Sequence, residues 1–278
     1  MEERKNPFQW LINIWTVTIT LLRNTPRVWE LARFEFTLQY RDSRLGMVWA
    51  ILSPLTQIGV YWFTFGIGLR HGSPMGGYPY VVWLVCGMTA WNHLSKGVLS
   101  GAGELRSKQG LIAKVSIPPY LLLASRALAA LMDHALQIAI MFAIMAANGW
   151  KPDHYAPNLC YYIFCSFCFC IAASTIFSAF TLIAADFRRL LESAMRLLFF
   201  LSPIFWNPGD NLPAWFQILL VISPFSYIVT GYRNSLLFHQ NFWQRPMETA
   251  AFWTLTVLLY LFGCQWQSKL HEKMADFI

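Results

Sequence analysis

Four cysteines stand close together in the pattern C-x4-C-x2-C-x-C, at Cys160, Cys165, Cys168 and Cys170. Thiolates at related spacings hold iron–sulfur clusters. These four, however, lie in an uncharged run over residues 154–185, and so close together on a helix they would point in several directions. A free cysteine packs as a small hydrophobic residue. We therefore expect structural cysteines, with neither a metal site nor a disulfide framework.

The motifs of the common catalytic sites are missing. The sequence contains no G-x-x-x-x-G-K-[ST] phosphate loop, no G-x-S-x-G, no H-E-x-x-H and no aspartate-rich motif for divalent metals. Histidines on an apolar background, such as His93 and His134, are typical of hydrogen-bonded structural residues. We therefore expect that this chain is not an enzyme and carries no cofactor.

Charged residues inside apolar runs are costly in a membrane and often functional. Arg126 and Asp133 are seven residues apart, which places them on one face of a helix. They form either a polar route or helix latch, or a pair that neutralises itself. Glu192 and Arg196 have the i,i+4 spacing of a helical ion pair, and we expect them to neutralise each other near the membrane interface.

Aromatic side chains gather in two of the apolar runs. Most aromatic residues near the ends of membrane helices form interfacial belts. Sugar rings also stack on aromatic rings, and a glycan sliding through a pore needs weak contacts that do not trap it. The candidates for such a path are Tyr61, Trp62, Phe65, Phe199, Phe200 and Trp206.

The composition of the chain indicates a membrane protein. Apolar residues make up 56% of the 278 residues and charged residues only 13%, about half the usual share. The net charge of +7 is divided into short clusters between apolar runs, which is the pattern of membrane loops rather than of a nucleic-acid surface. The first residues lack a small-residue cleavage site, so we expect no cleaved signal peptide.

Six runs are long and apolar enough to predict transmembrane helices. They cover residues 45–69, 80–98, 120–147, 159–184, 191–206 and 249–267. The sequence thus predicts an all-α, polytopic membrane protein. It divides into an N-terminal segment (1–44), a six-span transmembrane domain (45–267) and a tail (268–278).

Two further apolar segments are predicted not to span the membrane. Residues 8–22 are amphipathic and too short, which fits an interfacial helix. Residues 207–238 are apolar but broken by Pro208, Gly209, Pro213 and Pro224. We expect two short re-entrant helices that enter the membrane from outside, in preference to a loop lying flat on the interface.

The arginines and lysines predict the orientation. They are concentrated before residue 45, between the second and third spans, and between the fourth and fifth. Because positive charge favours the cytoplasmic side, we expect both termini in the cytoplasm and the protein in the cytoplasmic membrane.

Three segments resemble one family of membrane proteins. The segment FEFTLQYRDSRLGMVWAILSPL resembles the N-terminal signature of ABC-2 type permeases that export cell-surface polysaccharides. LSPIFWNPGDNLPAW and SPFSYIVTGYRNSLL are similar to the segment between the fifth and sixth spans of that family. Within the family the chain resembles teichoic acid translocation permeases most, and O-antigen and capsule exporters are also similar.

The resemblance implies a homodimer that recruits two copies of a separate ATPase chain, which binds the ATP and Mg. Residues 103–114 match the place of the helix that docks onto the ATPase, and the coupling residues would be Glu104, Leu105, Arg106, Lys108 and Gln109. On charge alone this segment also has the pattern of an exposed amphipathic connector. The substrate would be a glycopolymer on a polyprenyl diphosphate lipid.

Three arginines before the first span have two interpretations. Arg33, Arg41 and Arg44 either attract the diphosphate of the substrate or only hold the N-terminal segment in the cytoplasm. In either case we expect the membrane subunit of an ATP-driven exporter of a teichoic acid type polymer. The alternatives are an exporter of O-antigen or capsule, a small-molecule permease, and a membrane enzyme acting on lipid-linked sugars.

Overall fold

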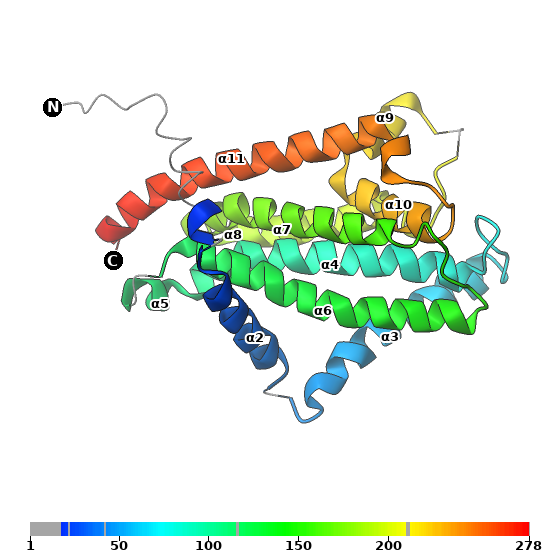
Figure 1. Cartoon of the computed structure of the whole chain (residues 1–278), viewed down its shortest axis with the longest axis horizontal. Helices are drawn as coiled ribbons and strands as arrows, with labels where there is room; N and C mark the ends of the chain where they lie inside the picture. The colour runs from blue at the N-terminus through cyan, green and yellow to red at the C-terminus, as the bar shows by residue number, and fades with distance from the viewer. Residues whose placement is uncertain (1–17, 22, 42, 115–116, 210–211, 278) are drawn as a thin grey trace.

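The structure is a computed structural model that describes residues 18–21, 23–41, 43–114, 117–209 and 212–277, with side chains omitted for 113–114 and from 268 onward. The described residues form helices and turns, with one isolated β-bridge between Met75 and Tyr78. The long helices run side by side along one axis (Figure 1). The all-α prediction is confirmed. The predicted interfacial helix at 8–22 falls almost entirely outside the described residues.

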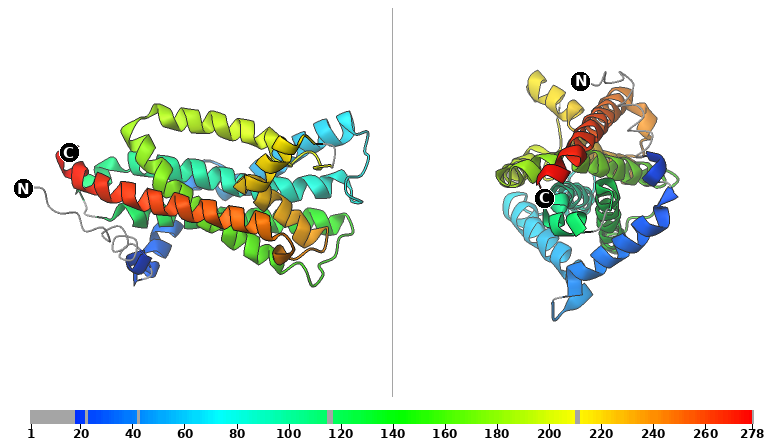
Figure 2. Two further views of the ribbon diagram at one scale, coloured as in Figure 1. Left: turned by 90° about the horizontal axis from the view of Figure 1, so that it is seen from above. Right: turned by 90° about the vertical axis from the view of Figure 1, so that its left-hand side faces the viewer.

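Helix α4 (Tyr80–Ser107) is the most deeply buried long helix, and α6 (Pro119–Ala147), α7 (Asn158–Ile183) and α10 (Pro224–Leu236) surround it. Most of its residues are buried, although it carries polar and charged side chains. Both views in Figure 2 show α4 and its neighbours in the middle of the molecule. These four helices form the core that positions every site described below.

Glycines let α4 and α7 approach closely. A Cβ atom on Gly97 would lie 3.0 Å from the Cβ of Cys170, and one on Gly101 would lie 2.6 Å from the Cβ of Ser174. The two contacts are one helical turn apart on both helices. Small residues at such positions allow membrane helices to pack backbone against backbone. Larger side chains would push the two helices apart.

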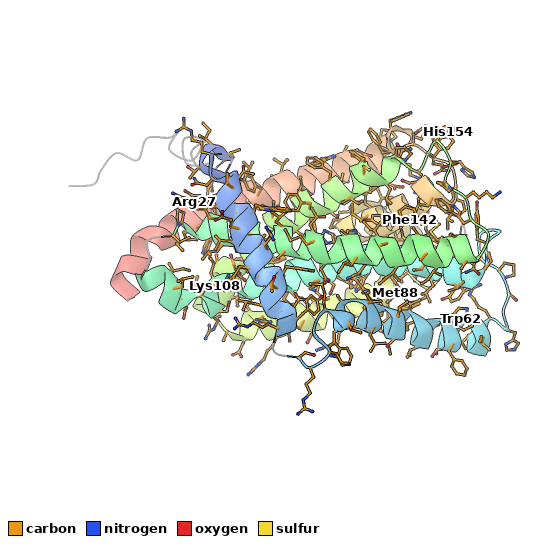
Figure 3. The ribbon with its side chains drawn as sticks, turned by 60° about the horizontal axis from the view of Figure 1, so that its bottom comes forward. Arg27, Trp62, Met88, Lys108, Phe142 and His154 are labelled. Atoms are coloured by element: carbon orange, nitrogen blue, oxygen red, sulfur yellow. The ribbon has the colours of Figure 1, made fainter. Side chains whose placement is uncertain are left out.

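Helices α2 (Thr25–Arg41) and α3 (Trp49–Tyr61) lie at the side of this core. Figure 3 shows α2 oblique to the bundle, at the end of the molecule where Lys108 is labelled. A short 3-10 turn (Gly46–Val48) leads into α3, which continues as a π-helix over Trp62–Leu69. Only 22% of the most apolar stretch of this span is buried, so much of its surface faces away from the core.

The second half of the chain contributes α8 (Asp186–Leu201), α9 (Ala214–Ile222), α10, a 3-10 turn (Phe242–Gln244) and α11 (Pro246–Phe277). The pair α9 and α10 is bent by 82°. The hydroxyl of Ser223 accepts a hydrogen bond from the backbone of Ser226, and Pro224 follows at the first helical position, so a new helix starts there. The predicted pair of short helices is present, and α10 is buried almost throughout.

The six-residue helix α5 (Gln109–Lys114) lies at one end of the bundle, and α9 and α10 lie at the other (Figures 1 and 2). Among the residues that the structure describes, four helices are long and apolar enough to cross a membrane, or five if the bent pair forms one span. They are Gly46–Leu69, Pro119–Ala147, Asn158–Ile183 and Pro246–Gln267. These match four of the six predicted spans, and the count of six stays a prediction.

One predicted boundary is wrong, and two helices extend beyond the predicted spans. The fifth run ends as a helix at Leu201 and not at Trp206, because Pro203 disfavours helical backbone at Ser202, which is extended. Helix α4 continues past residue 98 to Ser107. Helix α11 continues through the predicted tail to Phe277, since neither proline nor glycine interrupts residues 264–277.

Candidate functional site

Two adjoining cavities form a groove between α3, α4 and α8. Their volumes are about 530 and 380 Å³, and both are lined by Gln57, Trp91 and Ser95. The larger cavity extends toward α2 and α6, where Tyr40 and Asp133 lie. The smaller one extends along α8. A polar groove of this size among apolar helices is unusual, because polar groups in a membrane need partners or a function.

Asp133 is the polar centre of the larger cavity. Its carboxylate accepts hydrogen bonds from Lys96 at 2.7 Å, from Gln137 at 3.2 Å and from the hydroxyl of Tyr40. These donors come from α4, α6 and α2. Burial, reinforced by Asp133, raises the pKa of Tyr40, so its hydroxyl keeps the proton that it donates. Nearby, Asn92 donates to Gln57 at 3.2 Å and connects α4 with α3.

Arg126 and Asp133 do not pair, although they share a helix. Arg126 belongs instead to a cluster with Glu35, Glu104 and Lys108, at the α5 end of the molecule. Lys108 bonds both carboxylates, and the guanidinium of Arg126 lies 3.7 Å from Glu35 and 3.9 Å from Glu104. Both carboxylate side chains are only 6% exposed. This cluster joins α2, α4 and α6.

The pKa values of two members of the cluster, Glu104 and Lys108, are raised. Burial raises the pKa of Glu104, and the neighbouring Glu35 raises it further, whereas Lys108 and Arg126 act in the opposite direction. Burial alone would lower the pKa of Lys108, but its bonds to Glu104 and Glu35 outweigh burial and raise it. Lys108 is therefore the charge that keeps two buried carboxylates together.

The smaller cavity carries a different ion pair from the predicted one. Glu192 accepts from Arg188 at 3.1 Å, while Arg196 donates to the hydroxyl of Ser193 at 2.9 Å. The expected Glu192–Arg196 pair is therefore replaced by the i,i+4 pair that lies one turn earlier. All three charged side chains line the cavity beside Tyr61 and Phe199.

Aromatic rings from the first and fifth predicted spans meet in one cluster. The ring of Tyr61 lies 5.4 Å from that of Phe199, and Phe199 lies 5.2 Å from Phe200. Phe205 joins them, 4.5 Å from Phe65 and 5.0 Å from Tyr61. Four of the six aromatic candidates are thus brought together in this cluster, and two of them, Tyr61 and Phe199, line the groove.

The other two aromatic candidates lie apart from this cluster. Trp62 is 41% exposed and does not line the groove. Trp206 lies against Phe216 of α9, at 5.8 Å, and its indole nitrogen donates to the backbone oxygen of Phe200.

The predicted coupling residues are divided between buried and exposed positions. Glu104 and Leu105 are buried within α4, so the interpretation of residues 103–114 as an exposed connector is wrong for its first part. Arg106 donates to the backbone oxygen of Thr181 at 3.1 Å and links the ends of α4 and α7. Gln109 is exposed on α5.

The three basic candidates lie outside the groove. Arg33 and Arg41 are exposed on α2, and Arg44 is exposed in the turn that follows. None of them lines either cavity. Both interpretations of these arginines, as a site for the diphosphate and as charges that hold the N-terminal segment in the cytoplasm, therefore stay predictions.

Sequence reasoning missed several groove residues. Lys96 is the only charged side chain in the predicted second span, which is a signal that was readable in the sequence. Trp91, Gln57 and Tyr40 carried no comparable signal, because their roles depend on which helices pack together. The four clustered cysteines lie on α7 with exposures that differ from one to the next.

Long apolar helices packed around a polar and aromatic groove are the architecture of a multi-pass membrane protein. The model of the ABC-2 type transporter membrane family matches residues 26–237, and the chain belongs to this family.

The chain is also similar to the O-antigen export system permease protein RfbA of Myxococcus xanthus, with 23% identity over 90% of this chain and 94% of that protein. The protein of the same name from Klebsiella pneumoniae is 20% identical over 88% of this chain and 92% of its own length. The expected closeness to teichoic acid permeases is not supported by these relatives.

Proposed function

We propose that this chain is the membrane subunit of an ATP-driven exporter of a lipid-linked polysaccharide of the O-antigen type. The observation that carries the proposal is the groove, which combines polar and aromatic side chains within a helical membrane protein. The family and the names of the similar permeases support it. The O-antigen interpretation thus replaces the teichoic acid one.

The groove has the chemistry of a sugar path. Hydroxyl-rich chains need hydrogen-bonding partners that replace water, and Gln57, Asn92 and Ser95 offer amide and hydroxyl groups. The rings of Trp91, Tyr61 and Phe199 offer flat surfaces for stacking. The exposed arginines on α2 and in its following turn remain candidates for the diphosphate of the lipid.

Energy would come from a separate ATPase chain with its ATP and Mg. The exposed helix α5 is our candidate for its docking site, with both termini and α5 on the cytoplasmic side. Lys108 stands directly before α5 and binds Glu35 on α2. Movement of α5 would therefore reach α2, and through it α3 at the groove.

A second copy of the chain would close the groove. The groove is bordered by α3, and α3 and the π-helix that continues it expose Ile51, Leu55, Val60 and Phe63. A homodimer that buries this surface would enclose a passage between two grooves. The six-span arrangement of each copy is part of the same proposal.

The proposal is tested by deleting the gene from its host and measuring surface polysaccharide and cytoplasmic lipid-linked polymer. We expect surface polymer to disappear and lipid-linked polymer to accumulate inside, with both restored by the wild-type gene. Complementation with the double variant Tyr61→Leu, Phe199→Leu should restore only part of the export. Unchanged surface polysaccharide in the deletion strain would disprove the proposed function.

A further inference from the structure

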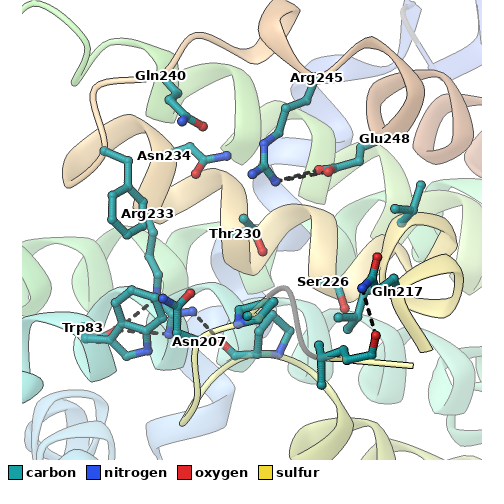
Figure 4. Close-up of a pocket in the computed structure, with 17 residues that line it drawn as sticks. Trp83, Asn207, Gln217, Ser226, Thr230, Arg233, Asn234, Gln240, Arg245 and Glu248 are labelled. Carbon is teal, nitrogen blue, oxygen red and sulfur yellow. Dashed lines mark hydrogen bonds and ion pairs between the residues drawn. The ribbon is translucent and has the colours of Figure 1, made fainter. Parts of the chain in front are cut away.

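A third cavity, of about 410 Å³, lies at the end of the molecule opposite α5. It is enclosed by α9, α10 and the start of α11, and it shares no lining residue with either cavity of the groove. Figure 4 shows its polar side chains pointing toward one another across the cavity. We call it the α10 pocket.

Arg233 fixes one wall of the α10 pocket. It is buried, it stacks on the ring of Trp83 at 3.9 Å, and its guanidinium donates to the backbone oxygens of Trp83, Pro203 and Ile204. Its donors are thus engaged by the protein itself. Arg233 holds α10 against α4 and the segment after α8, and it does not make the pocket an anion site.

Three polar residues of α10 face the cavity in one row. Ser226, Thr230 and Asn234 follow each other at i, i+4 and i+8 and therefore lie on one face of the helix. Ser226 is 4% exposed and Asn234 only 3%. Within the part of the chain that the structure describes, none of the three side chains makes a hydrogen bond. Buried polar groups without protein partners require water or a ligand.

The opposite wall offers further polar groups without net charge. Arg245 and Glu248 form an ion pair at 3.1 Å, and the amide of Gln240 lies beside them in Figure 4. The amide of Gln217 donates to the backbone oxygen of Leu212 and keeps its own oxygen for other partners. Two aromatic rings, Trp83 and Phe238, also line the cavity.

These groups together select the ligand. An apolar molecule would leave the row on α10 without partners, which is costly. A charged molecule would meet an ion pair that is already neutral. A neutral molecule with many hydroxyl groups satisfies both conditions, and the volume lies within the usual range of ligand pockets, about 300–1,000 Å³.

We propose that the α10 pocket binds a neutral sugar unit of a glycan, at a site separate from the groove. The inference rests on the proposed function, which supplies the class of ligand. In the orientation proposed above, the pocket lies on the outer side of the membrane. Its ligand is either the polymer as it leaves the groove or a free saccharide outside.

The test is a binding titration of the purified transporter, in complex with its ATPase, against oligosaccharides cut from the strain's own polysaccharide and freed of lipid. The variants are Thr230→Val, which removes a hydroxyl at constant shape, and Asn234→Leu. The matched control is Ser235→Ala, because Ser235 is buried on the same helix but bonded to the backbone oxygen of Gly231.

We expect each pocket variant to weaken binding tenfold or more, with Ser235→Ala close to wild type. Wild-type protein that shows no binding, or binding unchanged in Thr230→Val, would overturn the inference and leave only water in the pocket. If the wild-type gene restores export in the deletion strain, such a result for the α10 pocket does not contradict the proposed function.

Export in cells then separates the two sources of ligand. If the emerging polymer occupies the pocket, Thr230→Val should alter the rate of export or the length of the surface chains. If a free saccharide occupies it, Thr230→Val should weaken binding in the titration and leave export unchanged.

Discussion

Lys96 on α4 and Asp133 on α6 form an ion pair across the larger cavity of the groove, with 2.7 Å between Nζ and Oδ2. The lysine side chain is 29% exposed and the aspartate side chain only 6%. The pair thus places its cation toward the cavity and its anion in the protein. A hydroxyl-rich substrate in the groove would meet the ammonium group first.

Breaking this pair should cost stability. We expect Lys96→Met and Asp133→Leu each to lower the free energy of unfolding by about 2–3 kcal/mol, because each leaves a partly buried charge without its partner. The double variant should lose less than the sum of the two. Thermal unfolding in detergent measures all three. Additive losses would show that the two side chains do not interact.

The cluster around Lys108 predicts a pH dependence. A carboxyl group whose pKa is raised by folding gives stability at low pH that is lost as pH rises through the folded-state pKa. Lys108→Met removes a charge that opposes this rise at Glu104. We expect the variant to be less stable than wild type by about 3 kcal/mol at neutral pH, with the gap narrowing as the pH falls toward 4.5, the ordinary pKa of this carboxyl group.

The matched control for this prediction is Lys151→Met, which removes an exposed lysine at the opposite end of the molecule. It should leave the pH profile of the melting temperature unchanged. A difference in stability between Lys108→Met and wild type that stays constant with pH would contradict the proposed effect of Lys108 on the pKa of Glu104.

The aromatic cluster predicts a loss of transport without a large loss of stability. Tyr61→Leu and Phe199→Leu keep the cluster apolar but remove the flat rings, and such exchanges usually cost less than about 1.5 kcal/mol. We expect export to slow several-fold in each. The control is Phe262→Leu, since Phe262 is 59% exposed on α11 and lies outside the groove. An equal loss of export in all three variants would contradict the proposal that sugars pass along the groove.

The close contact of α4 and α7 predicts the cost of a single methyl group. Gly101→Ala places a Cβ against Ser174, and we expect a loss of about 1–3 kcal/mol in stability. Gly59→Ala is the control, because nothing lies within 4 Å of a Cβ built on Gly59. There, alanine should be neutral or slightly stabilising in the helix. Thermal unfolding of both variants checks the contact.

The proposed docking helix α5 predicts a binding defect. Leu111 is 40% exposed on α5, and Leu111→Asp should weaken association with the ATPase by placing a charge at an apolar contact. Co-purification of the two subunits measures this. Gln109→Asp, on the same helix, adds the same charge at a polar position and should weaken association less. Full retention of the ATPase by Leu111→Asp would place the docking site elsewhere.

The apolar runs were readable from the sequence, because lipid requires long uncharged stretches whatever the tertiary structure. Three candidate spans accordingly match predicted ones to within one residue at both ends, and the fourth, Pro246–Gln267, starts three residues before its predicted start. Its helix, α11, continues past residue 267. The end of α8 was misplaced because apolar composition continues through Phe205 and Trp206, whereas Pro203 stops the helix earlier. Composition alone does not distinguish an apolar helix from an apolar segment that follows the end of a helix.

Only part of the candidate functional site could be predicted from the sequence. Aromatic candidates in two distant runs do meet, since Tyr61 and Phe199 lie in contact. Charge partners were not predictable, because they lie on different helices. Arg126 approaches Glu35, which is 91 positions away by residue number, and Asp133 pairs with Lys96 rather than with a neighbour on its own helix. Periodicity finds faces of helices, but it does not show which face meets which.

The close glycine contacts of α4 and the loose packing of α3 indicate which helices would move in the proposed transport cycle. Close glycine contacts hold α4 against α7 and α10, whereas α3 and α8 border the groove with much of their surface outside the core. Widening the groove then requires only the separation of a few aromatic rings. In the transport cycle that we propose, a polymer many units long would pass through repeated openings, and the core would not have to be repacked between them.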